Sequence, residues 1–442
     1  MPMHESPTHV RTRLAGWLAA AACIAYVCRN SLAVVESTIR TEVGISEDMM
    51  GLIMGPAFFW SYALAQVPGG ALGQRFGTRR CLAFFSVLTS AATAAFGLAL
   101  SSAMLLVSRI AGGIGQAGLF PCSTLAMSRW FPRTERALAS GSLGAAMSIG
   151  GAIGAALTAE LLGWLHWRSI FFLYAVPGLV WAILFSRWFR ETPEEHPDVN
   201  AAERSLIRTG LTDSPSETGS VMPPLGKSVQ HRNLSAFRLC MICGQQFFRA
   251  AGYAFFSSWF ATFLQETRGV TTARSGWLLT LPLLATVFAS LLAGRLSDRL
   301  LNRFQNLRLA RAGVASLSLL TCAILIYLSR YISSPEKATM MIAAGAFFAA
   351  FAGPCAYAMT IDAGGRKVAT VFGTMNMVGN FGAGLLPLVV PSVRRYVAGN
   401  PRLLDLCGGE AWNAVLALFS LMYVLAAFCW RIMPFQDLED SE

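Results

Sequence analysis

The sequence predicts an all-α membrane protein in which twelve transmembrane helices form two similar six-helix bundles. Three observations predict this class: an apolar composition, twelve apolar runs of spanning length, and a motif that recurs in the second half. Of the 442 residues, 54% are hydrophobic and only 13% are charged, whereas soluble domains carry about 25% charged residues. This composition excludes an ordinary soluble domain.

The apolar runs give the positions of the expected helices, because a helix that crosses a bilayer needs about 20 apolar residues. The runs predict spans at residues 14–35, 50–72, 80–100, 102–127, 138–162, 169–189, 239–265, 275–297, 309–330, 337–360, 369–392 and 411–432. A long polar stretch divides them six and six. The predicted organisation is a cytoplasmic tail (1–13), an N-terminal bundle (14–190), a cytoplasmic linker (191–238), a C-terminal bundle (239–433) and a cytoplasmic tail (434–442).

The basic residues predict the orientation. Most of the 35 Lys and Arg residues fall in loops on the same side as the N-terminus, and positively charged loops stay in the cytoplasm. We therefore expect an inner-membrane (cell-membrane) protein with both termini in the cytoplasm. The same rule explains the net charge of +11, so nucleic-acid binding is not expected.

The ten cysteines predict neither disulfides nor a metal site. Most lie in apolar spans, and the Cys240–Cys243 pair has no second pair or histidine nearby. No nucleophile–base pair stands out either. An enzyme, a cofactor and a bound metal are therefore not expected.

A short motif occurs once in each half. Gly70-Ala-Leu-Gly-Gln-Arg75 follows the second span, and Gly294-Arg-Leu-Ser-Asp-Arg299 follows the eighth. Internal symmetry of this kind is typical of transporters built from paired bundles. The first copy continues to Gly77 and Arg79-Arg80, and it resembles the signature loop of the major facilitator superfamily, with Gln74 in place of the usual Asp.

Other segments resemble the anion:cation symporter family of that superfamily. They are Tyr26-x-x-Arg29, the run from Phe58 to Gly70, Arg109-x-x-x-Gly113, Trp130-Phe131-Pro132 and the stretch from Gly373 to Asn380. That family includes carriers of hexuronates, aldonates, aldarates, glutamate and sialic acid. The resemblance implies the major facilitator fold, alternating access and a small organic anion as substrate.

Three arginines lie inside spans that contain no acid. Residues 14–35 carry only Arg29, residues 102–128 only Arg109, and residues 239–265 only Arg249. A guanidinium stays charged in a protein, and placing one in mid-membrane costs roughly 3 kcal/mol. We expect the charge to be used for binding an anion during transport. The alternative is a salt bridge or carbonyl contact between helices.

Arg29 is the expected main anchor, and it would bind a carboxylate through two parallel hydrogen bonds. Arg249 is the expected second anchor across the cavity, and such a pair also suits an exchanger of phosphate esters for phosphate. A transport-inactive sensor on a transporter scaffold is a third possibility. The other expected substrate-binding residues are Tyr26, Tyr62, Gln245, Gln246, Tyr253, Thr360, Asn376 and Asn380.

The resemblance assigns Arg109 to a helix-packing and relay motif, but the usual proton-carrying acids are absent. Cys28 and Gln116 occupy their places, and an amide does not ionise. Glu36 and Glu160 are substitutes that we expect to anchor helices at the membrane interface. Facilitated diffusion, exchange and coupling to H⁺ or Na⁺ stay open.

The loops near the cytoplasmic face contain charges that the resemblance assigns to gating. We expect these residues to form ion pairs between the two bundles that hold the outward-open state and break when the inside opens. They are Arg75, Glu135, Arg136, Asp298 and Arg299. The alternative is simple solvated loop charge. The expected partners of the protein are the lipid bilayer and the anion, and the expected assembly is a monomer.

Overall fold

The computed structural model describes residues 6–212, 236–304, 306, 308–364 and 368–434. The N-terminal half consists of α1 (Val10–Val43), α2 (Glu47–Met54), α3 (Pro56–Phe76), α4 (Thr78–Gly97), α5 (Ser102–Ala117), α6 (Leu119–Trp130), α7 (Arg133–Leu161) and α8 (Trp167–Trp188). Two short elements follow in the linker, the 3-10 turn η1 (Pro193–Glu195) and α9 (Ala201–Thr212).

The C-terminal half repeats this plan. It consists of α10 (Ala236–Ala254), α11 (Phe260–Arg268), α12 (Thr272–Phe304), the π-helical turn η2 (Arg308–Gly313), α13 (Val314–Ser329), α14 (Pro335–Ala350), α15 (Ala352–Gly364), α16 (Val368–Ala398), α17 (Pro401–Leu406) and α18 (Ala411–Ile432). All the described elements are helical, as the composition predicts.

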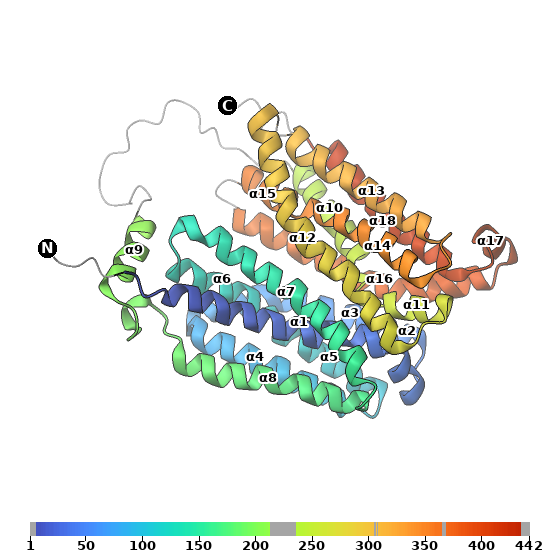
Figure 1. Ribbon diagram of the computed structural model, residues 1–442, viewed down its shortest axis with the longest axis horizontal. Helices are drawn as coiled ribbons and strands as arrows, with labels where there is room; N and C mark the ends of the chain where they lie inside the picture. Colours follow the sequence, from blue (N-terminus) through green and yellow to red (C-terminus); the bar gives the residue numbers. More distant parts are fainter. Residues whose placement is uncertain (1–5, 213–235, 305, 307, 365–367, 435–442) are drawn as a thin grey trace.

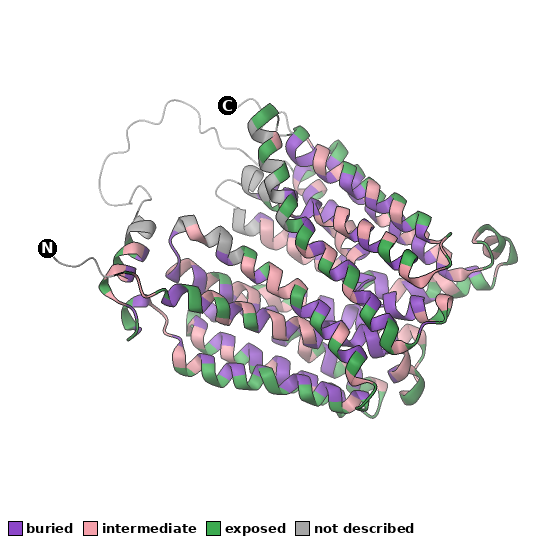
Figure 2. Ribbon diagram, viewed as in Figure 1, coloured by how far each residue is buried: buried purple, intermediate pink, exposed green. Residues whose placement is uncertain are grey.

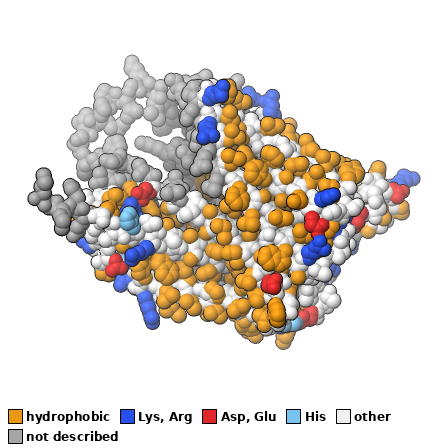
Figure 3. All heavy atoms as spheres, viewed as in Figure 1, with side chains coloured by type: hydrophobic (Ala, Val, Ile, Leu, Met, Phe, Trp, Pro, Cys, Tyr) orange, Lys and Arg blue, Asp and Glu red, His pale blue; other side chains and the backbone are white. Residues whose placement is uncertain are grey.

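Ten helical segments of the described chain are long and apolar enough to cross a membrane. Helices α10 and α11 follow one another in the chain, and the long helix α12 comes next. These helices pack beside the ten segments (Figure 1) and complete the twelve expected spans. Large apolar side chains such as Leu100, Phe288 and Leu317 are exposed. Hydrophobic side chains cover the middle of the visible face, while charged ones gather toward its two ends (Figure 3). This is the surface of a protein embedded in lipid.

Several expected spans are interrupted where helices approach one another closely. The second span breaks at Gly55, where a Cβ would lie 2.3 Å from the carbonyl oxygen of Gly384. The fourth breaks at Gly118, where a Cβ would lie 1.9 Å from the Phe85 ring. Only glycine permits these contacts. Hydropathy did not predict the breaks, because it does not report which backbones touch.

The two halves lie beside each other and are closer at one end than at the other (Figure 1). We call the end that carries α9 and residues Val10, Phe76 and Trp130 the linker end, and the opposite end the far end. Side chains of α1 and α11 bond to each other at the far end. Buried residues line the helix faces that meet inside each half (Figure 2).

The linker folds back onto the N-terminal half. Helix α1 begins at Val10, earlier than hydropathy predicts, because Glu203 of α9 accepts hydrogen bonds from the backbone N–H groups of Val10 and Arg11, both at 3.0 Å. The Arg11 side chain joins Glu203, at 3.2 Å, to Glu135 of α7, at 2.8 Å. A carboxylate at a helix N-terminus is stabilising, so this contact fixes the start of α1.

The stability that the Glu203 carboxylate contributes to the fold depends on pH. Burial acts to raise the pKa of Glu203, but hydrogen bonds from Thr8 and from the backbone of Arg11 and Val10 outweigh it and lower this pKa. A carboxyl whose folded pKa is lowered stabilises the fold at neutral pH and loses that contribution as pH falls through the folded pKa. The linker contact is therefore expected to weaken in acid.

Substituting Glu203→Gln should lower the unfolding free energy at neutral pH by about 1–3 kcal/mol, because buried N–H donors lose their acceptor. Thermal unfolding of purified protein measures this change. Glu194→Gln is the matched control, since Glu194 pairs with Arg208 at the exposed surface of the same linker and should change stability by less than about 0.5 kcal/mol. Equal losses from the two variants would contradict the prediction.

Candidate functional site

Arg29 lies in α1 between the two ends of the molecule, and aromatic rings surround its guanidinium group. The guanidinium carbon lies 4.4 Å from the centre of the Phe58 ring, 4.7 Å from Tyr26, 5.1 Å from Tyr62 and 5.5 Å from Phe59. Its Nη1 donates a hydrogen bond to the Tyr26 hydroxyl at 3.2 Å. The negative faces of the rings stabilise the buried cation, so α1 and α3 hold it without a carboxylate.

Arg29 has no ion pair within the described residues. Its side chain is nearly buried, with 8% of the residue surface exposed. Its Nε has no hydrogen-bond partner there, and a buried donor without a partner costs free energy. The guanidinium therefore retains both charge and hydrogen-bonding capacity for an added acceptor.

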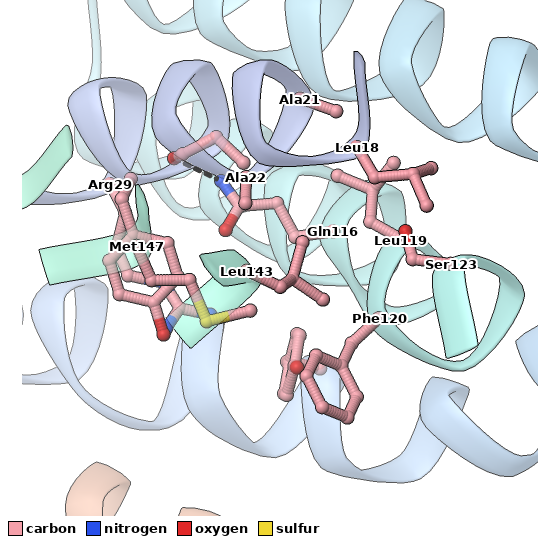
Figure 4. A pocket seen from close by; sticks show the side chains of 13 residues that line it. Leu18, Ala21, Ala22, Arg29, Gln116, Leu119, Phe120, Ser123, Leu143 and Met147 are labelled. Atoms are coloured by element: carbon pink, nitrogen blue, oxygen red, sulfur yellow. Dashed lines mark hydrogen bonds between the residues drawn. The ribbon is translucent and has the colours of Figure 1, made fainter. Parts of the chain in front are cut away.

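A pocket that is partly open to solvent borders Arg29. Tyr26, Tyr62 and Gln116 also line it, and Leu18 and Phe120 extend it toward the linker end. Figure 4 shows side chains from α1, α5, α6 and α7 directed into this space. Its walls are mainly apolar and its polar groups few, which is typical of a small-molecule site.

Arg109 of α5 lies beside the same aromatic group. Its guanidinium carbon is 4.6 Å from the centre of the Phe58 ring, so one ring contacts two cations. Arg109 borders a second pocket together with Cys28, Ser108 and Gln116. No ion pair includes Arg109 among the described residues.

The two side chains that replace the expected acids have structural contacts. The Gln116 amide donates to the carbonyl of Ala25 at 3.0 Å and joins α5 to α1, as Figure 4 shows. The Cys28 thiol lies 3.5 Å from the carbonyl of Tyr174 on α8. Both residues border the pocket that contains Arg109, but neither supplies a charge there.

In the C-terminal half, Arg249 of α10 is partly buried. Its Nη2 donates to Gln246 at 2.7 Å, and its Nε has no partner within the described residues. The Tyr253 hydroxyl lies within electrostatic range of both Arg29 and Arg249. Tyr253 is therefore the residue of this group that the structure places near Arg29, and the binding roles of Arg249 and Gln246 stay predictions.

Two expected substrate-binding residues do not reach this region. Gln245 and Thr360 are both fully buried. The Gln245 amide donates to the carbonyl of Ile242 at 3.0 Å, and the Thr360 hydroxyl donates to the carbonyl of Ala356 at 2.7 Å. Both also lie against the sulfur of Met375. In this conformation neither side chain borders the pocket beside Arg29: the amide nitrogen of Gln245 and the Thr360 hydroxyl bond within their own helices, while Oε1 of Gln245 has no partner within the described residues.

Asn376 of α16 bonds across the two halves. Its Nδ2 donates to Oε1 of Gln66 on α3 at 2.8 Å, and Nε2 of Gln66 lies 3.5 Å from the Tyr62 hydroxyl. Asn380 donates to the backbone carbonyl of Asn376 at 2.8 Å. A polar chain thus runs from the aromatic group around Arg29 to the C-terminal half. Gln66 was noted in the sequence only as part of a motif, because its partner lies far away in the chain.

The expected ion pairs at the linker end are not formed by the residues that can be described. Glu135 pairs with Arg11 inside the N-terminal half, while Arg75 and Arg299 are exposed and have no ion pair within the described residues. Arg136 and Asp298 fall outside the side chains described. The gating prediction concerns a conformation in which this end is closed, whereas the two halves lie apart at this end here (Figure 1), so it stays a prediction.

Ion pairs between the halves lie at the far end instead. Arg40 of α1 pairs with Glu266 of α11 at 3.3 Å, and with Glu36 and Glu47 of its own half at 2.8 and 3.3 Å. Arg394 of α16 pairs with Glu47 at 3.0 Å and with Glu266 at 2.5 Å. We call these five residues the far-end cluster. The sequence signal was present in the charges that flank the first, second, seventh and eleventh spans, but their proximity was not.

Further contacts close the far end. The Trp412 indole donates to Glu266 at 2.9 Å and its ring lies 4.3 Å from the Arg394 guanidinium. Arg395 pairs with Asp48. Glu160 is exposed, and its place at the membrane interface stays a prediction. The same expectation is wrong for Glu36, which is fully buried between the halves.

The sequence model of the Major Facilitator Superfamily matches residues 18–387 and 242–440. The chain belongs to this superfamily. The matches cover both halves, so the family accounts for the repeated motif and for the paired helices of the structure.

Curated relatives of the chain are named as anion transporters. The probable sulfoacetate transporter SauU of Cupriavidus necator is 29% identical over 85% of this chain and 84% of its own. The D-galactonate transporter of Escherichia coli O6:H1 is 30% identical over 91% and 92%. The probable galactarate/D-glucarate transporter GudP of Bacillus subtilis is 26% identical over 94% and 92%.

Solved structures share the fold. A bacterial homolog of the human lysosomal transporter Spinster, in an inward-facing and occupied conformation, has a TM-score of 0.76 and 19% identity over 96% of this chain and 97% of that chain. The xylose transporter XylE of E. coli has a TM-score of 0.64 and 15% identity over 96% and 98%.

The Gln66–Asn376 bond should couple the two residues energetically. We expect Gln66→Leu and Asn376→Leu to be non-additive by about 0.5–1.5 kcal/mol, the net contribution of one hydrogen bond. Thermal unfolding of both single variants and the double variant measures this coupling. Gln66→Leu with Asn380→Leu is the control pair and should be additive within about 0.5 kcal/mol. Additive changes in unfolding free energy for Gln66→Leu and Asn376→Leu would contradict the predicted energetic coupling.

Proposed function

We propose that this chain is a secondary transporter that moves a small organic anion, a sugar acid or a related carboxylate, by alternating access. The observation that carries the proposal is the buried guanidinium of Arg29, which borders a pocket and has no ion pair within the described residues. The names of the curated relatives support the same substrate class.

Arg29 is suited to bind the acid group of the substrate. A guanidinium donates two parallel hydrogen bonds to a carboxylate or sulfonate, which fixes the orientation of the group. The surrounding rings keep water away from the pair and strengthen its attraction. Tyr26 and Tyr62 offer hydroxyl groups to the rest of the substrate, and Gln246 and Tyr253 offer polar atoms from the opposite half.

The conformation described is suited to one half of the transport cycle. We propose that the linker end faces the cytoplasm, in accord with the positively charged loops. The far-end cluster then closes the outer side, while the pocket beside Arg29 extends toward the cytoplasm. The reverse conformation requires the far-end ion pairs to separate and the halves to meet at the linker end.

Substituting Arg29→Ala should lower anion exchange by at least about tenfold, because each hydrogen bond to a charged group contributes about 1.5–3 kcal/mol. Arg29→Lys should recover only part of it, since an ammonium lacks the planar fork. Counterflow of D-galactonate, galactarate and sulfoacetate in proteoliposomes measures the rates. Arg431→Ala, at an exposed position of α18, is the control. Wild-type exchange by Arg29→Ala would refute the proposal.

Exchange of phosphate esters for phosphate is the competing function. We expect inorganic phosphate not to support counterflow, because the curated relatives are named for sugar acids and a sulfonate and not for phosphate. The measurement replaces the external organic anion with phosphate under otherwise identical conditions. Phosphate exchange that is lost in Arg249→Ala would favour the phosphate exchanger instead.

A further inference from the structure

Glu36 is the acid of the far-end cluster whose side chain is fully buried. It lies on α1, seven residues and about two turns after Arg29, and its side chain is 0% exposed. One carboxylate oxygen accepts from Nε of Arg40 at 2.8 Å. The other contacts the hydroxyl of Thr262 on α11, in the opposite half. A buried acid therefore lies directly on the contact between the two halves.

The charges around Glu36 do not balance. The far-end cluster contains two guanidinium groups, those of Arg40 and Arg394, and three carboxyl groups, those of Glu36, Glu47 and Glu266. With all three acids ionised the cluster has one excess negative charge. Burying an unbalanced charge is costly, and a carboxyl group avoids the cost by binding a proton.

The other charged groups near this end do not remove the excess. Arg395 is paired with Asp48, and His166 and Arg168 are paired with Glu42. Arg274 on α12 is paired with Glu336. Arg268, at the end of α11, donates to the carbonyl of Thr267 and has no ion pair within the described residues.

Among the three acids, Glu36 is the one that the closed far end removes from water. The side chains of Glu47 and Glu266 keep 25% and 32% of their surface exposed, while Glu36 keeps none. The Thr262 hydroxyl can accept a hydrogen bond from a protonated carboxyl as well as donate to an ionised one. Of the three carboxyl groups, Glu36 is thus the one whose protonation removes the largest cost of burying a charge.

We propose that Glu36 is a proton-binding site of the transport cycle, and that it takes up a proton when the far end closes. Opening separates α1 from α11, exposes the carboxyl to water and releases the proton. This proposal rests on alternating access as proposed above, but it concerns the closing of the far end and not the identity of the anion. It differs from coupling through the positions of Cys28 and Gln116, which do not carry acids.

The test measures the conformation without substrate, so it does not depend on whether the chain transports any anion. Nitroxides are attached through azide-bearing residues at Thr41 on α1 and Arg402 on α17, two exposed positions on opposite halves. Pulsed electron paramagnetic resonance measures the distance between the two nitroxides. The ratio of short to long distances gives the ratio of molecules with a closed far end to molecules with an open one. The measurement runs from about pH 5 to about pH 9, a range that includes the titration of buried glutamates.

In the wild type, the closed-to-open ratio should rise as pH falls, by up to about tenfold per pH unit for one proton. In Glu36→Gln the ratio should not depend on pH. The matched control is Glu160→Gln, at an exposed position of α7, which should retain the wild-type profile. A pH dependence that survives in Glu36→Gln would overturn the proposal.

A second variant keeps the test decisive if Glu36→Gln does not fold. Glu47→Gln leaves two guanidinium groups and two carboxyl groups in the far-end cluster, so Glu36 would stay ionised to lower pH. The titration should therefore move to lower pH, and an unchanged position would contradict the charge-balance argument. A closed fraction that follows the sodium concentration at constant pH, and not pH itself, would also overturn the proposal.

Discussion

The structure depends on holding a permanent positive charge inside a membrane protein without an acid beside it. A guanidinium cannot lose its proton to escape the low dielectric, and no carboxylate reaches Arg29 among the described residues. The rings of Tyr26, Phe58, Phe59 and Tyr62 take that place. Because rings stabilise a cation less strongly than a carboxylate does, the charge is held in position while its attraction for an external acid is preserved.

Helix α3 connects the aromatic group around Arg29 to other parts of the molecule. Arg109 contacts the same Phe58 ring as Arg29, so the two cations are placed by one side chain of α3. Gln66, one helical turn beyond Tyr62, reaches Asn376 of the other half. Tyr62, which lies against Arg29, and Gln66, which contacts the other half, thus share one helix, and α3 links the proposed binding site to the contact between the halves.

The sequence predicted the fold well, because apolar length and basic loops report directly on crossing a membrane. It also predicted that Arg29, Tyr26 and Tyr62 lie together, since their spacing matched a family motif. In this conformation Gln245 and Thr360 do not border the pocket beside Arg29, and their hydrogen bonds stay within the C-terminal half. Hydropathy does not show toward which neighbour a polar side chain turns. For the same reason Glu36 was expected at the membrane surface, although α11 covers it.

The replacement of a counter-ion by aromatic rings has an electrical consequence. With Arg29, Arg109 and Arg249 uncompensated by protein acids in the described part of the chain, the unloaded carrier is more positive than the loaded one. A membrane potential acts on each net charge with about 2.3 kcal/mol per 100 mV when the whole field is crossed. A membrane potential therefore acts most strongly on the step in which the empty binding site returns across the membrane. A bound anion reduces the net charge and hence this effect.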